Sequence, residues 1–258
     1  MRTTTKCMVY TILRELPNFG LMNPAHLQVS VDCVIFGYDD DGLKVLLIEQ
    51  RAPESAEPSR SMSIQHALPG DLILQDESLD DAAQRVLFEL TRLEGIYMKQ
   101  FHAFGDPHRV REPKDQVWLQ SFRVEPEARV LTVAYYGLVS LHEHTPEPAS
   151  FAGGTKWVDV GEIPDLAFDH NDIVNGAFDT LREQLESHYI SFELLPKKFT
   201  LSQLQTLHEV VLNKKFDKRN FRKNVKRMSH VVPLDEKQTG VLHKPAQLFS
   251  FSPDSIEE

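Results

Sequence analysis

The chain has 258 residues, of which 41% are hydrophobic and 26% charged, a composition that is typical of a globular protein and excludes a disordered or fibrous one. Two cysteines are too few for a disulfide framework, and no apolar run is long enough for a signal peptide or a membrane helix. We therefore expect a soluble, cytoplasmic protein without a membrane partner.

The net charge of −10 is unevenly distributed. Residues 192–251 contain 12 Lys and Arg against 5 Asp and Glu, whereas residues 1–191 contain 16 bases and 30 acids. An acidic body with a basic C-terminal module indicates two functions, one of which is compatible with a phosphate-containing partner or requires one. We divide the chain into two predicted domains, residues 1–190 and residues 191–258.

The acidic body begins with a predicted hairpin. An apolar strand at 29–36, an Asp/Gly turn at 39–42 and a second strand at 44–49 have the pattern of two antiparallel strands. A loop rich in Pro, Ser and Glu follows at 52–61.

A central helix is predicted after Ser78, because Ser78 and Asp81 have the spacing of a helix N-cap. Gly95 is the expected C-cap. The predicted apolar face consists of Ala82, Val86, Phe88, Leu90 and Leu93. Later strands are expected at 129–141 and 155–160, and a last helix at 171–188. Strands around a central helix make the body α/β or α+β.

Several motifs of the body resemble the Nudix box. The run Leu68-Pro69-Gly70, then Glu77, then residues 85–90 follow its spacing. Residues 104–109, 133–136 and 166–170 are similar to segments of the ADP-ribose-type members. The resemblance implies an α+β Nudix-like sandwich.

The resemblance also implies glutamates at positions 86, 89 and 90, but the chain has Val86, Glu89 and Leu90. Magnesium in such a site needs several carboxylate oxygens, and positions 86 and 90 share one helix face. We therefore expect a binding domain without hydrolytic activity, catalytic residues, metal or cofactor. Glu77, Arg85 and Glu89 are interpreted as an ion-pair scaffold for the helix.

Polar residues near the expected cleft are the candidates for binding a small effector. Asp32 and Lys44 interrupt otherwise apolar strands, which is compatible either with a lined cavity or with a strand edge. The other candidates belong to loops that flank the cleft: Arg51, His66, Asp71 and Arg109.

The basic module has the order of a winged helix-turn-helix. Thr200 and Gln203 form a capping box for a first helix, and Asp217 caps a second one that is predicted to extend to Met228. A polar stretch and an apolar return at 230–251 predict a two-stranded wing.

The second helix is the predicted reading helix for double-stranded DNA. The residues expected near base edges are Lys218, Arg219, Asn220, Arg222 and Lys223. The residues expected at phosphates are Lys226, Arg227 and Lys244.

Together the two modules resemble the Nudix-related transcriptional regulators. The resemblance implies a homodimeric repressor that binds a palindromic operator and senses either ADP-ribose or a sugar such as L-arabinose. The altered box and an additional segment at 112–127 depart from the ADP-ribose pattern and favour the sugar. The alternatives are a Nudix hydrolase of ADP-ribose or a related nucleoside diphosphate, and a binding module whose winged helix contacts proteins.

Overall fold

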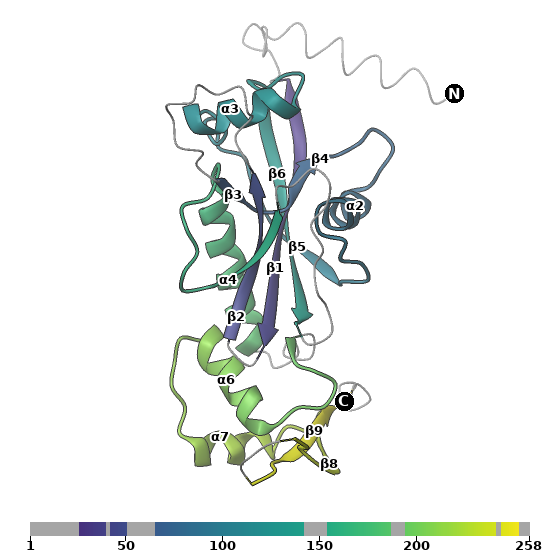
Figure 1. The fold of residues 1–258 in the computed structure, drawn as a ribbon, viewed down its shortest axis with the longest axis vertical. Helices are drawn as coiled ribbons and strands as arrows, with labels where there is room; N and C mark the ends of the chain where they lie inside the picture. The colour runs from purple at the N-terminus through teal and green to yellow at the C-terminus, as the bar shows by residue number, and fades with distance from the viewer. Residues whose placement is uncertain are drawn as a thin grey trace, which may run out of the picture.

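The structure, a computed structural model, describes residues 26–39, 42–50, 65–141, 154–186, 194–240 and 244–252. The molecule is elongated, with a sheet-based body at one end and a small module of helices and a hairpin at the other (Figure 1). Within these ranges, no helix combines the length and the apolar character needed to cross a bilayer.

The body is built on one mixed sheet in the order β3-β2-β1-β6-β5. Its centre is β1 (Leu27–Asp39), which is antiparallel to β2 (Gly42–Gln50) and parallel to β6 (Arg129–Ser140). The predicted hairpin is confirmed, since Asp39 pairs with Gly42. The remaining strands are β3 (Gln65–Ala67), β4 (Gly70–Leu72), β5 (Met98–Phe104) and β7 (Gly154–Asp159).

Helices cover both faces of the sheet, α2 (Leu79–Thr91) on one and α4 (His170–Glu186) on the other (Figure 1). Alternating side chains of β1 pack into the two hydrophobic cores on either face of the sheet, because successive residues of a strand point to opposite faces. Val31, Cys33 and Ile35 belong to the core that includes α2, and Val34 and Phe36 to the core that includes α4. The predicted α/β sandwich is thus confirmed.

The start of α2 follows the prediction, but its end does not. The Ser78 hydroxyl accepts a hydrogen bond from the Asp81 N–H at 3.1 Å. The helix ends at Thr91 and its C-cap is Arg92, whose φ of 60° is left-handed, so the predicted cap at Gly95 is wrong. Phe88, placed on the apolar face by the prediction, is 42% exposed and lies beneath the guanidinium of Arg92.

A helix that the sequence did not predict, α3 (Pro113–Phe122), occupies the additional segment. Its apolar pattern is weak, since Leu119 is buried whereas Val117 is exposed. It lies at the end of the body farthest from the C-terminal module (Figure 1).

The C-terminal module has the predicted order of elements: α6 (Leu201–Val211), α7 (Lys218–Val225), β8 (Val231–Lys237) and β9 (Gln247–Phe251). The capping box is confirmed, because the Gln203 N–H donates to the Thr200 hydroxyl at 3.2 Å and the Thr200 N–H to the Gln203 side chain at 2.8 Å. Helix α7 ends at Val225, earlier than the predicted Met228.

One hydrophobic core joins the module to the body. Leu181 and Leu185 of α4 belong to the same buried cluster as Leu204 and Leu207 of α6 and Phe221 of α7. The Tyr38 hydroxyl at the end of β1 also donates to the Gln203 carbonyl at 3.2 Å. A movement of α4 therefore changes the packing of α6.

Candidate functional sites

A buried ion-pair network centred on Arg109 lies at the start of α4. The Arg109 guanidinium donates from Nε and Nη2 to the two carboxylate oxygens of Asp169, at 2.8 and 2.6 Å. Nη2 also reaches Asp32 Oδ2 at 3.4 Å. The side chains of Arg109 and Asp32 are only 3% and 8% exposed, so water solvates them little. The two opposite charges therefore neutralise each other in the interior.

His170, the first residue of α4, completes this network. Its Nδ1 accepts a hydrogen bond from the Leu68 N–H at 2.9 Å, so the proton of the neutral ring is on Nε2, 3.6 Å from Asp32 Oδ1. Burial lowers the pKa of His170 and keeps the ring neutral near pH 7. Burial alone would raise the pKa of Asp32, but His170 and Arg109 lower it below its usual value. Since His170 is neutral near pH 7, the positive charges that act on Asp32 at that pH are those of Arg109 and Arg123.

Strand β4 lies against this network through its first residue, Gly70. Gly70 pairs with Asp32, and a Cβ at Gly70 would lie 1.8 Å from Asp32 Oδ1, so only glycine permits this approach. The next residue, Asp71, is exposed and pairs with Val31. Arg123, at the C-terminal end of α3, lies within electrostatic range of Asp32, Asp71 and Arg109.

Aromatic side chains connect α3 to the start of α4. Phe168 packs between Trp118 and His170, with ring centroids 5.4 and 5.1 Å apart. Asp115 of α3 is buried, and its Oδ1 accepts a hydrogen bond from Gln65 at 3.2 Å. Burial raises the pKa of Asp115.

The structure brings together two of the six predicted effector residues, Asp32 and Arg109. Asp71 is paired with Val31, whose side chain faces α2, so its side chain lies on the other face of the sheet. His66 lies on β3, where its Nε2 faces Glu49 Oε1 at 3.4 Å. Lys44 forms an ion pair with Asp39 at the other end of β1, away from the network. Strand β2 is paired there with both β1 and β7, so Lys44 does not lie at a strand edge. Arg51 lies outside the described residues.

Four residues of this region were not predicted as site residues: Arg123, Trp118, Asp169 and His170. The last two belong to a segment whose similarity to the family was noted, which is a signal that could have found them. No comparable signal marks Arg123 and Trp118, because the helix that positions them was not predicted.

The predicted scaffold on α2 is present. Arg85 donates to Glu77 at 2.9 and 2.7 Å and to Glu89 at 3.1 Å, and the hydrogen bonds from Arg85 lower the pKa of Glu77. Val86 is buried in the core, and Leu90 packs against it. In the part of the chain that the structure describes, no three His, Cys, Asp or Glu side chains are grouped to hold a metal ion.

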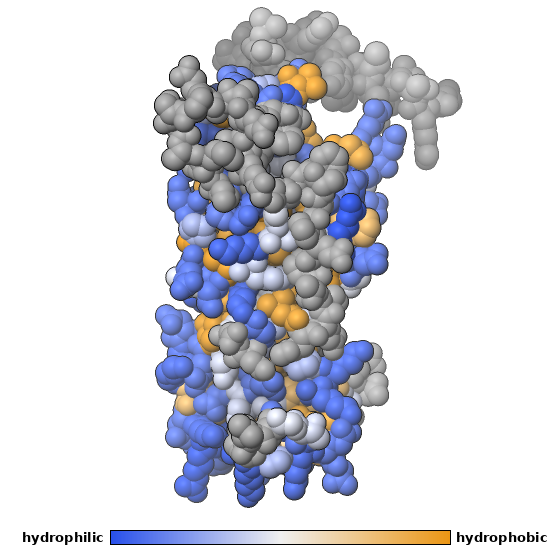
Figure 2. Space-filling view, viewed as in Figure 1, coloured by the Kyte–Doolittle hydropathy of each residue, from blue (hydrophilic) through white to orange (hydrophobic). Residues whose placement is uncertain are grey.

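Helix α7 presents a basic surface at the far end of the molecule. Phe221 and Val225 are buried against α6, and Asp217 caps the helix by accepting from the Asn220 N–H at 2.9 Å. Arg219 and Lys223 lie opposite the buried stripe, given 100° per residue. Figure 2 shows mainly hydrophilic residues at this end. The predicted DNA-binding residues are all exposed: Lys218, Arg219, Asn220, Arg222, Lys223, Lys226, Arg227 and Lys244.

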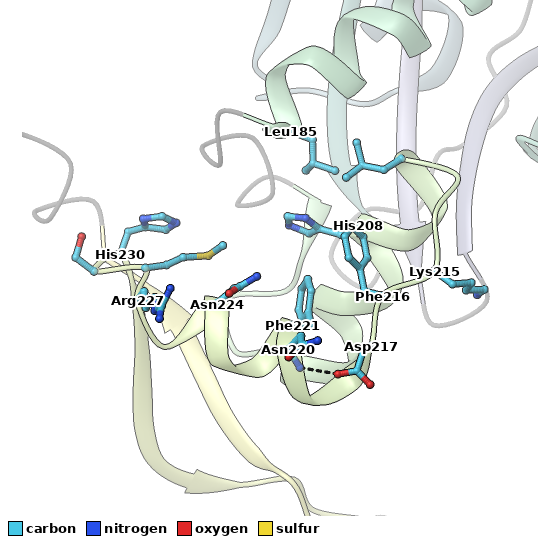
Figure 3. Close-up of a pocket in the computed structure, with 13 residues that line it drawn as sticks. Leu185, His208, Lys215, Phe216, Asp217, Asn220, Phe221, Asn224, Arg227 and His230 are labelled. Carbon is cyan, nitrogen blue, oxygen red and sulfur yellow. Dashed lines mark hydrogen bonds between the residues drawn. The ribbon is translucent and has the colours of Figure 1, made fainter.

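A pocket of ≈ 820 Å³ lies where α7 meets the end of α4 (Figure 3). Leu185 of α4, His208 of α6 and Phe221 of α7 form its apolar part. Asn220 of α7 and Arg227, in the turn after α7, also line it, so these two predicted DNA-binding residues border the pocket. The pocket thus lies between the end of α4 and the basic helix.

Comparison with known proteins agrees with this two-part organisation. Residues 26–176 match the family model of the NUDIX domain, and residues 191–251 match that of the NrtR DNA-binding winged helix domain. The ADPR responsive transcriptional repressor NtrR of Acinetobacter baylyi is 28% identical over 228 residues, which are 87% of this chain and 82% of that protein.

Solved structures give the same match. The crystal structure of Shewanella oneidensis NrtR is 28% identical with a TM-score of 0.63, and the alignment covers 89% of this chain and 96% of that one. The structure of the same protein complexed with a 27mer DNA is 27% identical with a TM-score of 0.62, over 88% of this chain and 94% of that one.

Proposed function

Because this chain belongs to the Nudix-related transcriptional regulators, with a NUDIX domain followed by an NrtR-type winged helix, we propose that it represses transcription in response to ADP-ribose. The winged helix binds an operator, and ADP-ribose in the Nudix domain releases it. A cytoplasmic location follows from this role.

The observation that carries the DNA-binding part is α7, a short capped helix with four exposed cationic side chains. Lys218, Arg219, Asn220, Arg222 and Lys223 occupy its first two turns, which in a helix-turn-helix enter the major groove. Lys226, Arg227 and Lys244 are proposed to contact phosphates. Because Asn220 and Arg227 line the pocket beside α4, we expect their contacts to depend most on the position of α4.

ADP-ribose replaces the sugar that the sequence analysis favoured. The Acinetobacter relative is named for its response to ADPR, whereas a sugar effector such as L-arabinose finds no support among the relatives described above. The exposed carboxylate of Asp71 suits ribose hydroxyls, which donate hydrogen bonds. Asp32 and Arg109 hold the start of α4 on the other face of the sheet.

The Nudix domain is proposed to bind its effector without hydrolysing it. Val86 and Leu90 replace two box glutamates with apolar side chains that pack in the core, and both remaining carboxylates, Glu77 and Glu89, are engaged by Arg85. A magnesium ion held by carboxylates would have to break these ion pairs first.

Helix α4 is the proposed connection between the two functions. Its first residue, His170, belongs to the buried network, and its 17 residues span about 25 Å to Leu185 beside α6. An effector that shifts the start of α4 thereby shifts α6 and α7. In a homodimer, which we propose from the family, this shift changes the spacing of two reading helices on a palindromic operator.

The test is capture of fragmented genomic DNA by the purified protein, followed by anisotropy titration of the recovered site. We expect a palindromic site whose affinity falls at least 10-fold with ADP-ribose and does not change with L-arabinose. If the operator affinity is retained with ADP-ribose and lost with L-arabinose, the sugar is the effector. If no DNA is enriched at low salt, the proposed repressor function is wrong. Release of AMP from ADP-ribose with Mg²⁺ would favour the hydrolase.

A further inference from the structure

Several buried polar atoms beneath α3 have no hydrogen-bond partner among the described residues. Asp115 Oδ2 on α3 is one of them. Three others are Gln28 Oε1 on β1, Gln116 Oε1 on α3 and Arg123 Nη1 at the end of α3. Buried polar groups are normally satisfied, so atoms without partners indicate a missing water, ion or ligand. We call these three residues the α3 polar cluster.

The members of this cluster face the same space. Leu119 of α3 packs against Val130 of β6, and Arg123 follows Leu119 by four residues, which places it on the same side of the helix. Gln28 pairs with Val130, and its side chain points to the same face of β1 as that of Asp32, since both numbers are even. The cluster is therefore continuous with the Asp32–Arg109 network.

Arg123 is the residue of the α3 polar cluster that determines which kind of ligand the cluster can bind. A guanidinium keeps its charge at all accessible pH values, and a buried charge without a partner is costly. Burial and the neighbouring Arg109 disfavour the charge of Arg123, and they lower its pKa although Asp32 and Asp71 act in the opposite direction. Neither carboxylate reaches Arg123 in an ion pair, whereas Arg109 is already bound by Asp32 and Asp169.

We infer that Arg123 binds an anionic group of the effector, and that α3 is the element which selects effectors carrying such a group. This rests on the proposed function, in which the effector is ADP-ribose and the anionic group is its diphosphate. The guanidinium donates to phosphate oxygens, while nearby carboxylates accept from ribose hydroxyls. One cluster thus recognises a phosphorylated sugar rather than a free one.

The cluster also explains why this helix is held in place from several sides. Gln116 Nε2 donates to the Val110 carbonyl at 2.6 Å, and Asp115 accepts from Gln65 at 3.2 Å. Trp118 packs against Phe168, two residues before His170. An anion bound at Arg123 therefore acts on a helix that already contacts the start of α4.

The experiment compares Arg123→Gln with wild type by calorimetric titration of ADP-ribose and by thermal unfolding with inorganic pyrophosphate, both in buffer without divalent metal. We expect Arg123→Gln to bind ADP-ribose about 10- to 100-fold more weakly, the range for losing one charged hydrogen bond. Pyrophosphate is expected to raise the Tm of wild type and not that of the variant.

Two variants control for indirect effects. Arg129→Gln removes an exposed arginine, six residues away, that donates to the Gly105 carbonyl at 3.3 Å, and it should bind as wild type does. Arg123→Lys keeps the charge but not the forked donors, and it should recover part of the affinity.

Equal ADP-ribose affinity in wild type and Arg123→Gln would overturn the inference and leave the proposed function intact. If wild type does not bind ADP-ribose, the proposed effector is wrong, and the pyrophosphate measurement alone tests Arg123. Stabilisation of the wild type but not of the variant by pyrophosphate then supports the anion site. If pyrophosphate stabilises both proteins equally, or neither of them, the inference is overturned. We would expect that result if a carboxylate of the chain itself were the partner of Arg123.

Discussion

Arg182, near the end of α4, donates a hydrogen bond from Nε to the backbone carbonyl of Val211, the last residue of α6, at 3.0 Å. The same guanidinium lies 4.4 Å from the centre of the Phe178 ring and donates to Asp179 at 3.0 Å. Helix C-termini have unsatisfied carbonyl groups, so this bond fixes the end of α6 to α4. It is a defined polar link between the effector domain and the reading module.

The first prediction concerns this link. Arg182→Ala should leave operator affinity within about threefold of wild type but reduce the effect of ADP-ribose on that affinity, because one of the contacts that transmit a shift of α4 to α6 is then lost. The loss of one hydrogen bond to a charged donor should also lower the free energy of unfolding by about 1.5–3 kcal/mol. Anisotropy titrations with and without ADP-ribose measure the first effect, and urea unfolding the second.

Asp179→Ala is the matched control, because it removes the neighbouring ion pair and keeps the bond to Val211. Asp179 is exposed, so little change is expected in either measurement. A full ADP-ribose response in Arg182→Ala would show that the coupling does not use this bond.

The second prediction concerns the basic face of α7. Arg222→Ala should weaken specific operator binding by about 1–3 kcal/mol if the side chain reads a base. Lys226→Ala should weaken binding to all sequences and reduce the salt dependence by about one counterion. The measurements are titrations of the captured operator and of a scrambled duplex at several salt concentrations.

Lys156→Ala provides the control for net charge, since Lys156 is exposed on β7 in the body. It should change neither the affinity nor the salt dependence. Unchanged operator affinity in both α7 variants would exclude this helix as the DNA contact.

The third prediction concerns the altered Nudix box. Val86→Glu restores a box glutamate at a position that is 1% exposed, so it buries a carboxylate in an apolar core. We expect a loss of about 3 kcal/mol or more in the free energy of unfolding, and no hydrolysis. Urea unfolding and an AMP-release assay with Mg²⁺ check both parts.

Phe88→Glu is the control on the same helix, because Phe88 is 42% exposed and two residues away. Its effect on stability should be below about 1 kcal/mol. Magnesium-dependent hydrolysis by a stably folded Val86→Glu protein would mean that the apolar residue at position 86 alone removed the activity.

Local signals in the sequence predicted much of this structure. Ser78, Thr200 and Asp217 were identified as helix caps, and each accepts the expected backbone hydrogen bond, because capping depends only on residues within one turn. The long strands β1 and β6 were also predicted, since their apolar runs are continuous.

The effector region was predicted only in part, because its contacts join distant residues. Asp32 and Arg109 were singled out separately, but nothing in the sequence indicated that they form a pair across 77 positions. Helix α3 has no regular apolar stripe, so Arg123 and Trp118 gave no signal. Phe88 was placed in the core because periodicity identifies an apolar face without showing how far the core extends over it.

The last prediction concerns pH. The folded-state pKa of His170 lies below the 6.5 of a free histidine, because burial disfavours the charged ring. Between the two pKa values the unfolded chain binds the additional proton, so the free energy of unfolding decreases as the pH falls below 6.5 and recovers above it. The slope from one such group is at most about 1.4 kcal/mol per pH unit.

His170→Gln should flatten this dependence between pH 7.5 and 5, while its amide oxygen can still accept from the Leu68 N–H. Asp32 does not contribute in this window, because its lowered pKa affects stability only as the pH falls below 3.8, the value for an unperturbed aspartate. Urea unfolding of both proteins at several pH values isolates the contribution of His170 as the difference between the two curves. Parallel curves would mean that the ring accepts its proton in the folded protein as readily as in the unfolded chain, and that the network beside α4 is more open to water than its burial indicates.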